Sequence, residues 1–109
     1  MDMVNPRRFE VYLVALDPTV GSEIRKTRPC VVVSPDEAND ALSTVIGAPM
    51  TSTIRNYPTR VHVRFQGRTG EIAIDQLRAL DKRRLIKKLG VISADAQRRL
   101  GAALVEFFS

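Results

Sequence analysis

A long polar segment near the start of the chain carries the residue types needed to cut RNA. Residues 17–29 are rich in turn-forming and charged residues, and loops of this length are commonly functional or mobile. Within the segment, Glu23 can take a proton and Arg28 can neutralise a charged phosphorane. Metal-free RNA cleavage needs only these two groups, because the ribose 2′-OH supplies the nucleophile. An ordinary ion pair between Glu23 and Arg28 that pins the loop is the alternative interpretation.

The charge of the chain favours a polyanionic partner. Residues 55–88 hold ten Lys and Arg against three Asp and Glu, whereas residues 1–54 carry a net charge of −2. Of the 17 basic residues, 13 are Arg, whose planar guanidinium suits bidentate phosphate contacts and stacking on bases. Acidic proteins would also fit such a surface. The basic residues of 82–88, taken alone, are equally consistent with the solvated face of a short helix.

The sequence lacks the strong motifs of nucleotide and metal enzymes. It has no phosphate-binding loop, no GxGxxG, no paired His at metal-ligand spacing and no Ser in a nucleophile-elbow sequence. Its single cysteine, Cys30, can form neither an intramolecular disulfide nor a zinc cluster. We therefore expect no metal, no cofactor and a reducing, cytoplasmic compartment. We expect no membrane insertion, because no apolar run approaches the roughly 18 residues that span a bilayer.

Several short strands must position these groups. Gly47 and Pro49 suggest that one of the strands contains a bulge or lies at an edge. Residues 36–42 predict one helical turn, and the turn-forming residues 66–70 predict a hairpin. Alternating or β-branched apolar residues predict strands over residues 10–16, 30–34, 44–50, 60–65 and 71–75.

Two helices are predicted in the last third of the chain. Asp81 is a natural N-cap for a short basic helix over residues 82–89, with Gly90 as its C-terminal stop. Ser93 caps a longer helix with an apolar stripe that faces either the core or a partner. The stripe consists of Ala96, Leu100, Ala103, Leu104, Phe107 and Phe108.

This order of elements predicts the fold class. Short strands separated by turns and closed by a helix indicate a mainly β (α+β) fold, a small twisted barrel or sandwich rather than a βαβ fold. The 109 residues, 44% of them hydrophobic, fit a single domain over residues 1–109 with a modest core. A domain this small often gains stability by dimerising.

Short segments with a characteristic order extend over most of the chain, from about Phe9 to Leu104. Each fragment is weak by itself, but the ordered set is similar to the MazF/PemK (Kid) family of type II toxin–antitoxin toxins. The segments are Asp-Pro-Thr at 17–19, Gly-Ser-Glu at 21–23, Arg-Pro at 28–29, Val-Val-Val-Ser-Pro at 31–35, Pro-Met-Thr-Ser at 49–52 and Asp-Gln-Leu-Arg-Ala-Leu-Asp at 75–81.

The resemblance implies a fold, an activity and partners. The fold would be an SH3-like β-barrel (CcdB/MazF-like) with added helices, working as a homodimer. The activity would be sequence-specific endoribonuclease cleavage of single-stranded RNA, neutralised by a cognate acidic antitoxin. Arg28 would stabilise the phosphorane or protonate the leaving 5′ oxygen, Thr51 would hold the scissile phosphate, and Glu23 would be a candidate general base.

The resemblance also implies RNA contacts, with departures from the family pattern. Ser22 stands where some members carry His, so a His-based mechanism is not expected, and His62 lies outside every family motif. Residues 24–27 and 52–57 are the candidate specificity loops, in which Tyr57 either stacks on a base or packs structurally. The predicted RNA-binding residues are Ser22, Arg25, Ser52, Tyr57, Asp75, Gln76 and Arg78.

Two alternative functions remain open from the sequence. One is a non-cleaving CcdB-like gyrase poison, which needs the barrel and an acidic partner but no cleavage chemistry. The other is a basic nucleic-acid-binding module in which residues 55–88 supply the affinity. The enzyme hypothesis alone predicts EDTA-insensitive cleavage that leaves 2′,3′-cyclic phosphate and 5′-hydroxyl ends.

Overall fold

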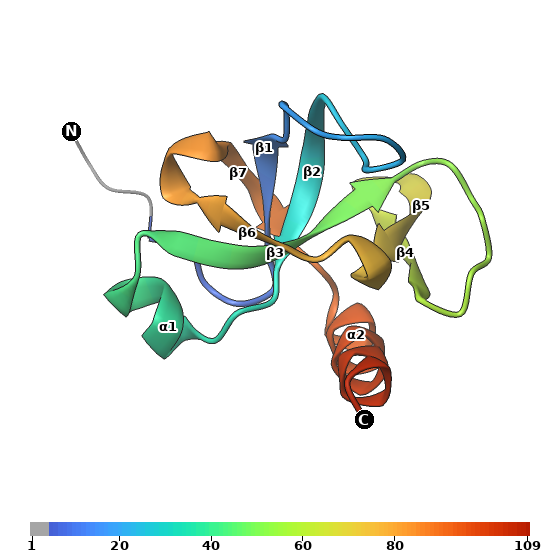
Figure 1. Ribbon diagram of the computed structural model, residues 1–109. Helices are drawn as coiled ribbons and strands as arrows, with labels where there is room; N and C mark the ends of the chain where they lie inside the picture. Colours follow the sequence, from blue (N-terminus) through green and yellow to red (C-terminus); the bar gives the residue numbers. More distant parts are fainter. Residues whose placement is uncertain (1–4) are drawn as a thin grey trace.

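The computed structural model describes residues 5–109 and shows a curled antiparallel sheet with two α-helices (Figure 1). The strands are β1 (Glu10–Ala15), β2 (Thr27–Val32), β3 (Thr44–Thr51), β4 (Arg60–Phe65), β5 (Arg68–Ala73), β6 (Arg78–Asp81) and β7 (Leu85–Val91). The helices are α1 (Asp36–Ala41) and α2 (Ala94–Phe107), with single 3-10 turns η1 (Ile74–Gln76) and η2 (Lys82–Arg84). The sheet order is β4-β5-β3-β2-β1-β7, and β6 also pairs with β3. The predicted mainly β, MazF-like architecture is confirmed as a curled half-barrel.

Strands β1 and β2 form a hairpin whose connection, residues 16–26, contains most of the long polar segment. The hairpin begins where Ala15 pairs with Thr27, and its interior is apolar because Val11 and Val31 are fully buried and paired. Cys30 is also buried, as a free thiol, and this burial raises its pKa to about 12. The hairpin therefore supplies a rigid base for a long loop, and its thiol is not a nucleophile.

Strand β3 lies inside the sheet and its pairings show no register shift, so neither predicted alternative for Gly47 and Pro49, an edge position or a bulge, is found. It pairs with β2 on one side and with β6 and β5 in turn on the other. Gly47 is required by packing, since a Cβ there would lie 2.7 Å from Leu80 Cδ1. Pro49 falls between the residues paired with β6, ending at Gly47, and those paired with β5, beginning at Met50. Both residues mark a change of partner and not an edge.

The predicted basic helix over residues 82–89 is also wrong. The Asp81 side chain does accept a hydrogen bond from the Arg83 N–H at 2.9 Å, but the turn it caps ends at Arg84. The chain then continues as β7, in which Leu85 pairs with Val14 and Gly90 with Val11. Pairing with β1 at five positions satisfies backbone groups along one side of β7, which outweighs the local helical signal. The four-residue strand β6 was not predicted.

Helix α2 packs against the sheet through only part of its apolar stripe. Ser93 Oγ accepts from the Ala96 N–H at 3.1 Å, which confirms the predicted cap. Ala96 and Leu100 are fully buried in the core, whereas Phe108 at the far end is 71% exposed. The stripe therefore faces the core over its first turns and solvent over its last. Among residues 5–109, no helix has the length and apolar character required to cross a membrane.

Candidate active site

A cavity of about 470 Å³ opens between the β1–β2 loop, the end of β3, the loop 52–59 and η1. We call it the central cavity. Most of the predicted site residues meet here, although they lie up to 54 positions apart in the chain. Its lining is Ser22, Glu23, Ile24, Arg25, Arg28, Thr51, Thr53, Arg55, Tyr57, Arg60, Asp75 and Gln76. Of the other predicted residues, Ser52 lines an adjoining pocket and Arg78 a third one.

Arg28 and Thr51 reach the central cavity from strands. Arg28 is the second residue of β2, and its Nε donates to the Arg25 carbonyl at 3.3 Å. Thr51 ends β3, and its Oγ1 accepts from the Thr53 N–H at 3.1 Å. Gly70 lets β5 approach, because a Cβ there would lie 2.6 Å from the Thr51 carbonyl oxygen. No carboxylate of residues 5–109 forms a salt bridge with Arg28, so its charge is available to an anion.

Glu23 lies in the loop itself. Its Oε1 accepts from the Val20 N–H at 2.6 Å, which closes a local turn. The alternative of a Glu23–Arg28 ion pair is not found in the described part of the chain. A carboxylate and an unpaired guanidinium thus line one cavity.

Gln76 joins the β1–β2 loop to the sheet. Its Oε1 accepts from the Ile24 N–H at 2.6 Å, and its Nε2 donates to the Ser22 carbonyl at 3.3 Å. Both ends of the predicted RNA-contacting amide therefore hold residues 22–24 against the cavity.

Arg60 is clamped between two carboxylates. Its Nε donates to Asp75 Oδ1 at 2.8 Å and its Nη1 to Glu71 Oε1 at 3.2 Å, leaving the side chain 6% exposed. Burial alone would raise the pKa of Asp75, but hydrogen bonds from Arg60 and Thr59 outweigh it and lower that pKa. Arg60 is thus a structural cation. The sequence predicted Arg60 as an exposed cation for a polyanionic partner, and this is wrong because two carboxylates hold it inside the protein.

Sequence reasoning missed Glu71, the fully buried acid beneath the loop 52–59. Its carboxylate accepts from the Arg55 N–H at 3.0 Å and the Asn56 N–H at 2.9 Å, and lies 3.1 Å from His62 Nε2. Burial raises the pKa of Glu71, but these donors and Arg60 overcome it and lower the pKa overall. The available signal was an acid directly before the apolar residues Ile72, Ala73 and Ile74.

The loop 52–59 presents an aromatic ring over this clamp. Tyr57 is 49% exposed, and the Arg60 guanidinium lies 5.1 Å from its ring centroid. The ring is open to a stacking partner on one side and supported by a cation on the other.

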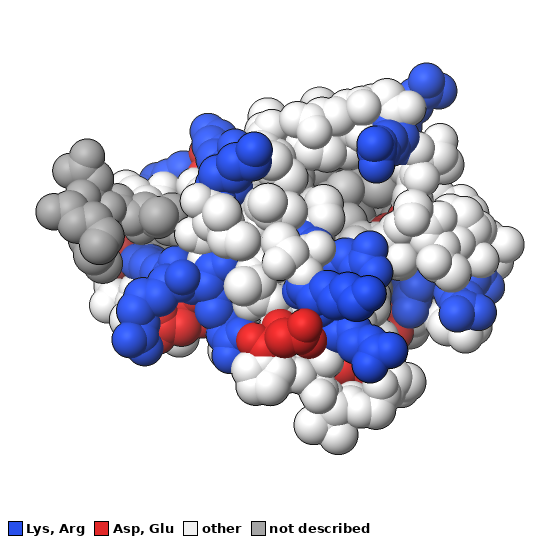
Figure 2. All heavy atoms as spheres, turned by 90° about the horizontal axis from the view of Figure 1, so that it is seen from above, with Lys and Arg blue, Asp and Glu red and all other residues white. Residues whose placement is uncertain are grey.

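Basic side chains surround the site, but several are used internally. Arg78 donates to the Leu16 carbonyl at 3.1 Å, and Arg84 to the carbonyls of Ala15 and Asp17 at 3.0 and 2.8 Å. Figure 2 looks down on the end of the molecule with the β1–β2 loop and shows Lys and Arg spread over it with few carboxylates.

Residues 5–109 contain no cluster of three His, Cys, Asp or Glu arranged to hold a metal ion. The arrangement suits an extended anion.

Comparison with known proteins agrees with this fold. A model of the family described as PemK-like, MazF-like toxin of type II toxin–antitoxin system matches residues 7–108. A crystal structure of MazF from Deinococcus radiodurans is 26% identical with a TM-score of 0.84, covering 96% of this chain and 97% of that one. An endoribonuclease from a mycobacterial species is 25% identical with a TM-score of 0.80, over 97% and 93% of the two chains. A mycobacterial endoribonuclease in complex with its cognate antitoxin is 25% identical with a TM-score of 0.80, over 94% of each chain.

Proposed function

The chain belongs to the PemK-like, MazF-like toxins of type II toxin–antitoxin systems, and on that premise we propose that it is an endoribonuclease acting on single-stranded RNA. The observation that carries the proposal is the meeting of Arg28, Thr51 and Glu23 around one cavity. Two similar solved structures are named endoribonucleases, which supports the same activity here.

The residues divide the reaction between them. Glu23 takes the proton from a ribose 2′-OH, and the freed O2′ attacks the adjacent phosphorus. The bond from phosphorus to the 5′ oxygen breaks, giving a 2′,3′-cyclic phosphate and a 5′-hydroxyl. Arg28 stabilises the phosphorane charge or supplies the proton to the leaving oxygen, which otherwise takes its proton from solvent water, while Thr51 holds the phosphate. The base and the positive charge in this sequence are both side chains, so we propose that the reaction needs no metal ion.

The basic surface around the central cavity is also the basis for proposing partners. We infer a cognate acidic antitoxin that covers the cationic end, since a similar endoribonuclease has been solved with its cognate antitoxin. A homodimer is the proposed working unit, consistent with the exposed Val105, Phe107 and Phe108 of α2.

Cleavage of a long, structure-poor RNA in EDTA tests the proposal. Discrete cuts with cyclic phosphate ends are expected, and Arg28→Ala should lower kcat/KM by about 100-fold or more. Arg98→Ala is the matched control, because it removes the same charge from an exposed α2 residue whose recorded partner is the equally exposed Asp95. An all-deoxy oligonucleotide should stay intact. Intact RNA with wild-type protein would instead favour the gyrase-poison or binding-module alternatives.

A further inference from the structure

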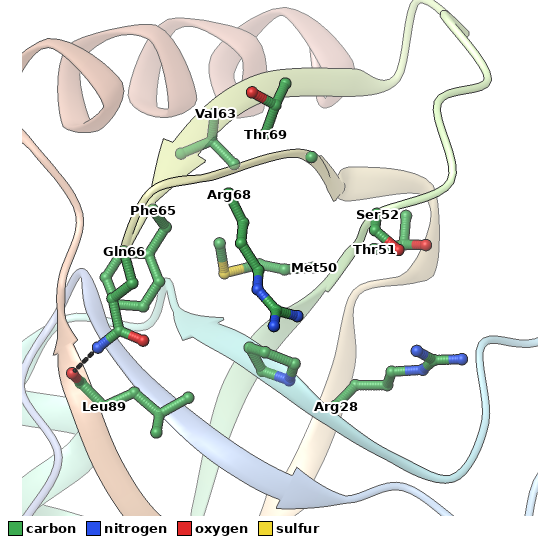
Figure 3. A pocket seen from close by; sticks show the side chains of 12 residues that line it. Arg28, Met50, Thr51, Ser52, Val63, Phe65, Gln66, Arg68, Thr69 and Leu89 are labelled. Atoms are coloured by element: carbon green, nitrogen blue, oxygen red, sulfur yellow. Dashed lines mark hydrogen bonds between the residues drawn. The ribbon is translucent and has the colours of Figure 1, made fainter.

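A second cavity adjoins the central one, beneath the β4–β5 hairpin (Figure 3). We call it the hairpin pocket. It measures about 350 Å³, near the lower end of the range for pockets that hold small organic ligands. Arg28 and Thr51 border both cavities, so the two are continuous at the proposed cleavage site. Its other lining residues are Pro29, Met50, Ser52, Val63, Phe65, Gln66, Arg68, Thr69, Gly70 and Leu89.

The floor of the hairpin pocket is apolar and fixed by the core. Met50 and Val63 belong to the buried core cluster, and Phe65 and Leu89 pack against it. Gln66 Nε2 donates to the Leu89 carbonyl at 2.8 Å, tying the hairpin tip to β7. The pocket is therefore preformed.

A guanidinium reaches over this floor. Arg68 pairs with Phe65, so both side chains leave the same face of the hairpin, and Figure 3 shows Arg68 extending across the pocket. Its side chain is exposed and forms no salt bridge with a carboxylate of residues 5–109. A planar cation above an apolar surface fits a flat ring with acceptor atoms at its edge.

We propose that the hairpin pocket binds one unpaired base of the RNA, the base of a nucleotide adjoining the phosphate held between Arg28 and Thr51. This inference rests on the proposed function and makes Arg68 a specificity-determining residue. Unpaired bases bind proteins by stacking on apolar or guanidinium surfaces with their edges hydrogen-bonded. An apolar side chain of the acidic partner proposed above would also use the floor and would bring carboxylates for the two cations. The shared border with the proposed cleavage site favours the base, because Arg28 and Thr51 line both cavities.

Non-cleavable oligonucleotides test the pocket separately from catalysis. The probes are 2′-O-methyl RNA trimers of each base, which lack the attacking hydroxyl, and an abasic sugar-phosphate trimer of equal charge. The readout is the methyl NMR signals of Met50, Val63 and Leu89. At least one base-bearing trimer should shift all three signals, and the abasic trimer should not. Arg68→Ala should raise the Kd of that trimer about tenfold.

Arg64→Ala is the matched control in the same hairpin. Arg64 alternates with Val63 and Phe65 along β4, so its side chain leaves the opposite face, and it is not among the residues that line the pocket. Its replacement removes the same charge and should change Kd less than about twofold.

The outcomes of this experiment distinguish base binding in the hairpin pocket from the proposed RNA cleavage. Unshifted signals with every trimer, or equal shifts with the abasic trimer, would overturn base binding while leaving RNA cleavage to its own assay. Shifts with N-acetyl-phenylalanine amide alone would assign the pocket to a protein side chain and also overturn it. Base-dependent shifts in a protein that cuts no RNA would keep the pocket and refute the enzyme.

Discussion

The two loops that wall the central cavity are held in different ways. The loop 52–59 is held from below by the buried Glu71 carboxylate, which accepts from two of its backbone N–H groups and from Arg60. The β1–β2 loop is held near its middle by one neutral amide, Gln76, at 2.6 and 3.3 Å. Charge-assisted hydrogen bonds in a solvent-free site are stronger than neutral bonds at a surface.

This difference assigns separate tasks to the two walls. The wall with Tyr57 is a fixed surface, because opening it would leave a buried charge without partners. Around residues 22–24, the wall with Glu23 can separate from the sheet at the cost of two neutral hydrogen bonds and the packing of Ile24 against the core. A flexible RNA strand needs one rigid surface that fixes its position and a second surface that can move to let it enter. We infer that the β1–β2 loop is the wall that moves.

Removing the Glu71 carboxylate should have the largest effect on the stability of the protein. Glu71→Ala leaves the Arg55 and Asn56 N–H groups and the Arg60 charge without their acceptor. We expect the free energy of unfolding to fall by about 3 kcal/mol, the lower end of the range for a broken buried pair, because the His62 side chain beside Glu71 is 58% exposed. Urea denaturation measures the loss.

Glu71→Gln is the control for shape. It keeps one acceptor oxygen but removes the charge, so its loss of stability should be smaller than that of Glu71→Ala. Hydrogen exchange should show faster exchange of the Arg55 amide in both variants. A Glu71→Ala protein of unchanged stability would show that the two loops are held equally weakly.

Low pH should weaken the interactions that hold the loop 52–59. Glu71 and Asp75 both have a folded-state pKa below the ordinary values of 4.5 and 3.8. Their stabilisation is therefore complete above those ordinary values and is lost as the pH falls through the lower folded ones. The free energy of unfolding should decline between about pH 5 and pH 2, and less steeply in Glu71→Gln. Parallel curves for the two proteins would exclude Glu71 as a source of the decline.

Releasing the movable wall should have the smallest effect on stability. Gln76→Ala removes the hydrogen bond to Ile24 and should cost about 1 kcal/mol. Exchange of the Ile24 amide should quicken about fivefold, while the Arg55 amide stays protected. Gln76→Glu keeps an acceptor for Ile24 and should preserve its protection. Faster exchange in both loops would show that the walls are coupled.

Local patterns predicted most of the elements. Alternating apolar residues identified β1 and β4, and Ser93 correctly marked the start of α2. The turn-forming residues 66–70 identified the β4–β5 hairpin, although β5 begins at Arg68 and ends at Ala73, before the predicted strand over 71–75 ends. The pattern failed at residues 82–89, because pairing with β1 is a contact between distant segments that no local window contains. Gly47 was likewise misread, since the Leu80 side chain that demands it is far away in the sequence.

The sequence by itself determined which chemical groups are present and which loop carries them. Arg28, Glu23 and Thr51 were identifiable from residue type, loop length and ordered motifs, because proton affinity and charge belong to the side chain. Only the tertiary structure decided which charges remain available. Arg60 and Arg28 are the same residue type, yet folding buries one between two carboxylates and leaves the other facing a cavity. Partners and exposure arise from segments brought together by the sheet, and they set the electrostatic role of each side chain.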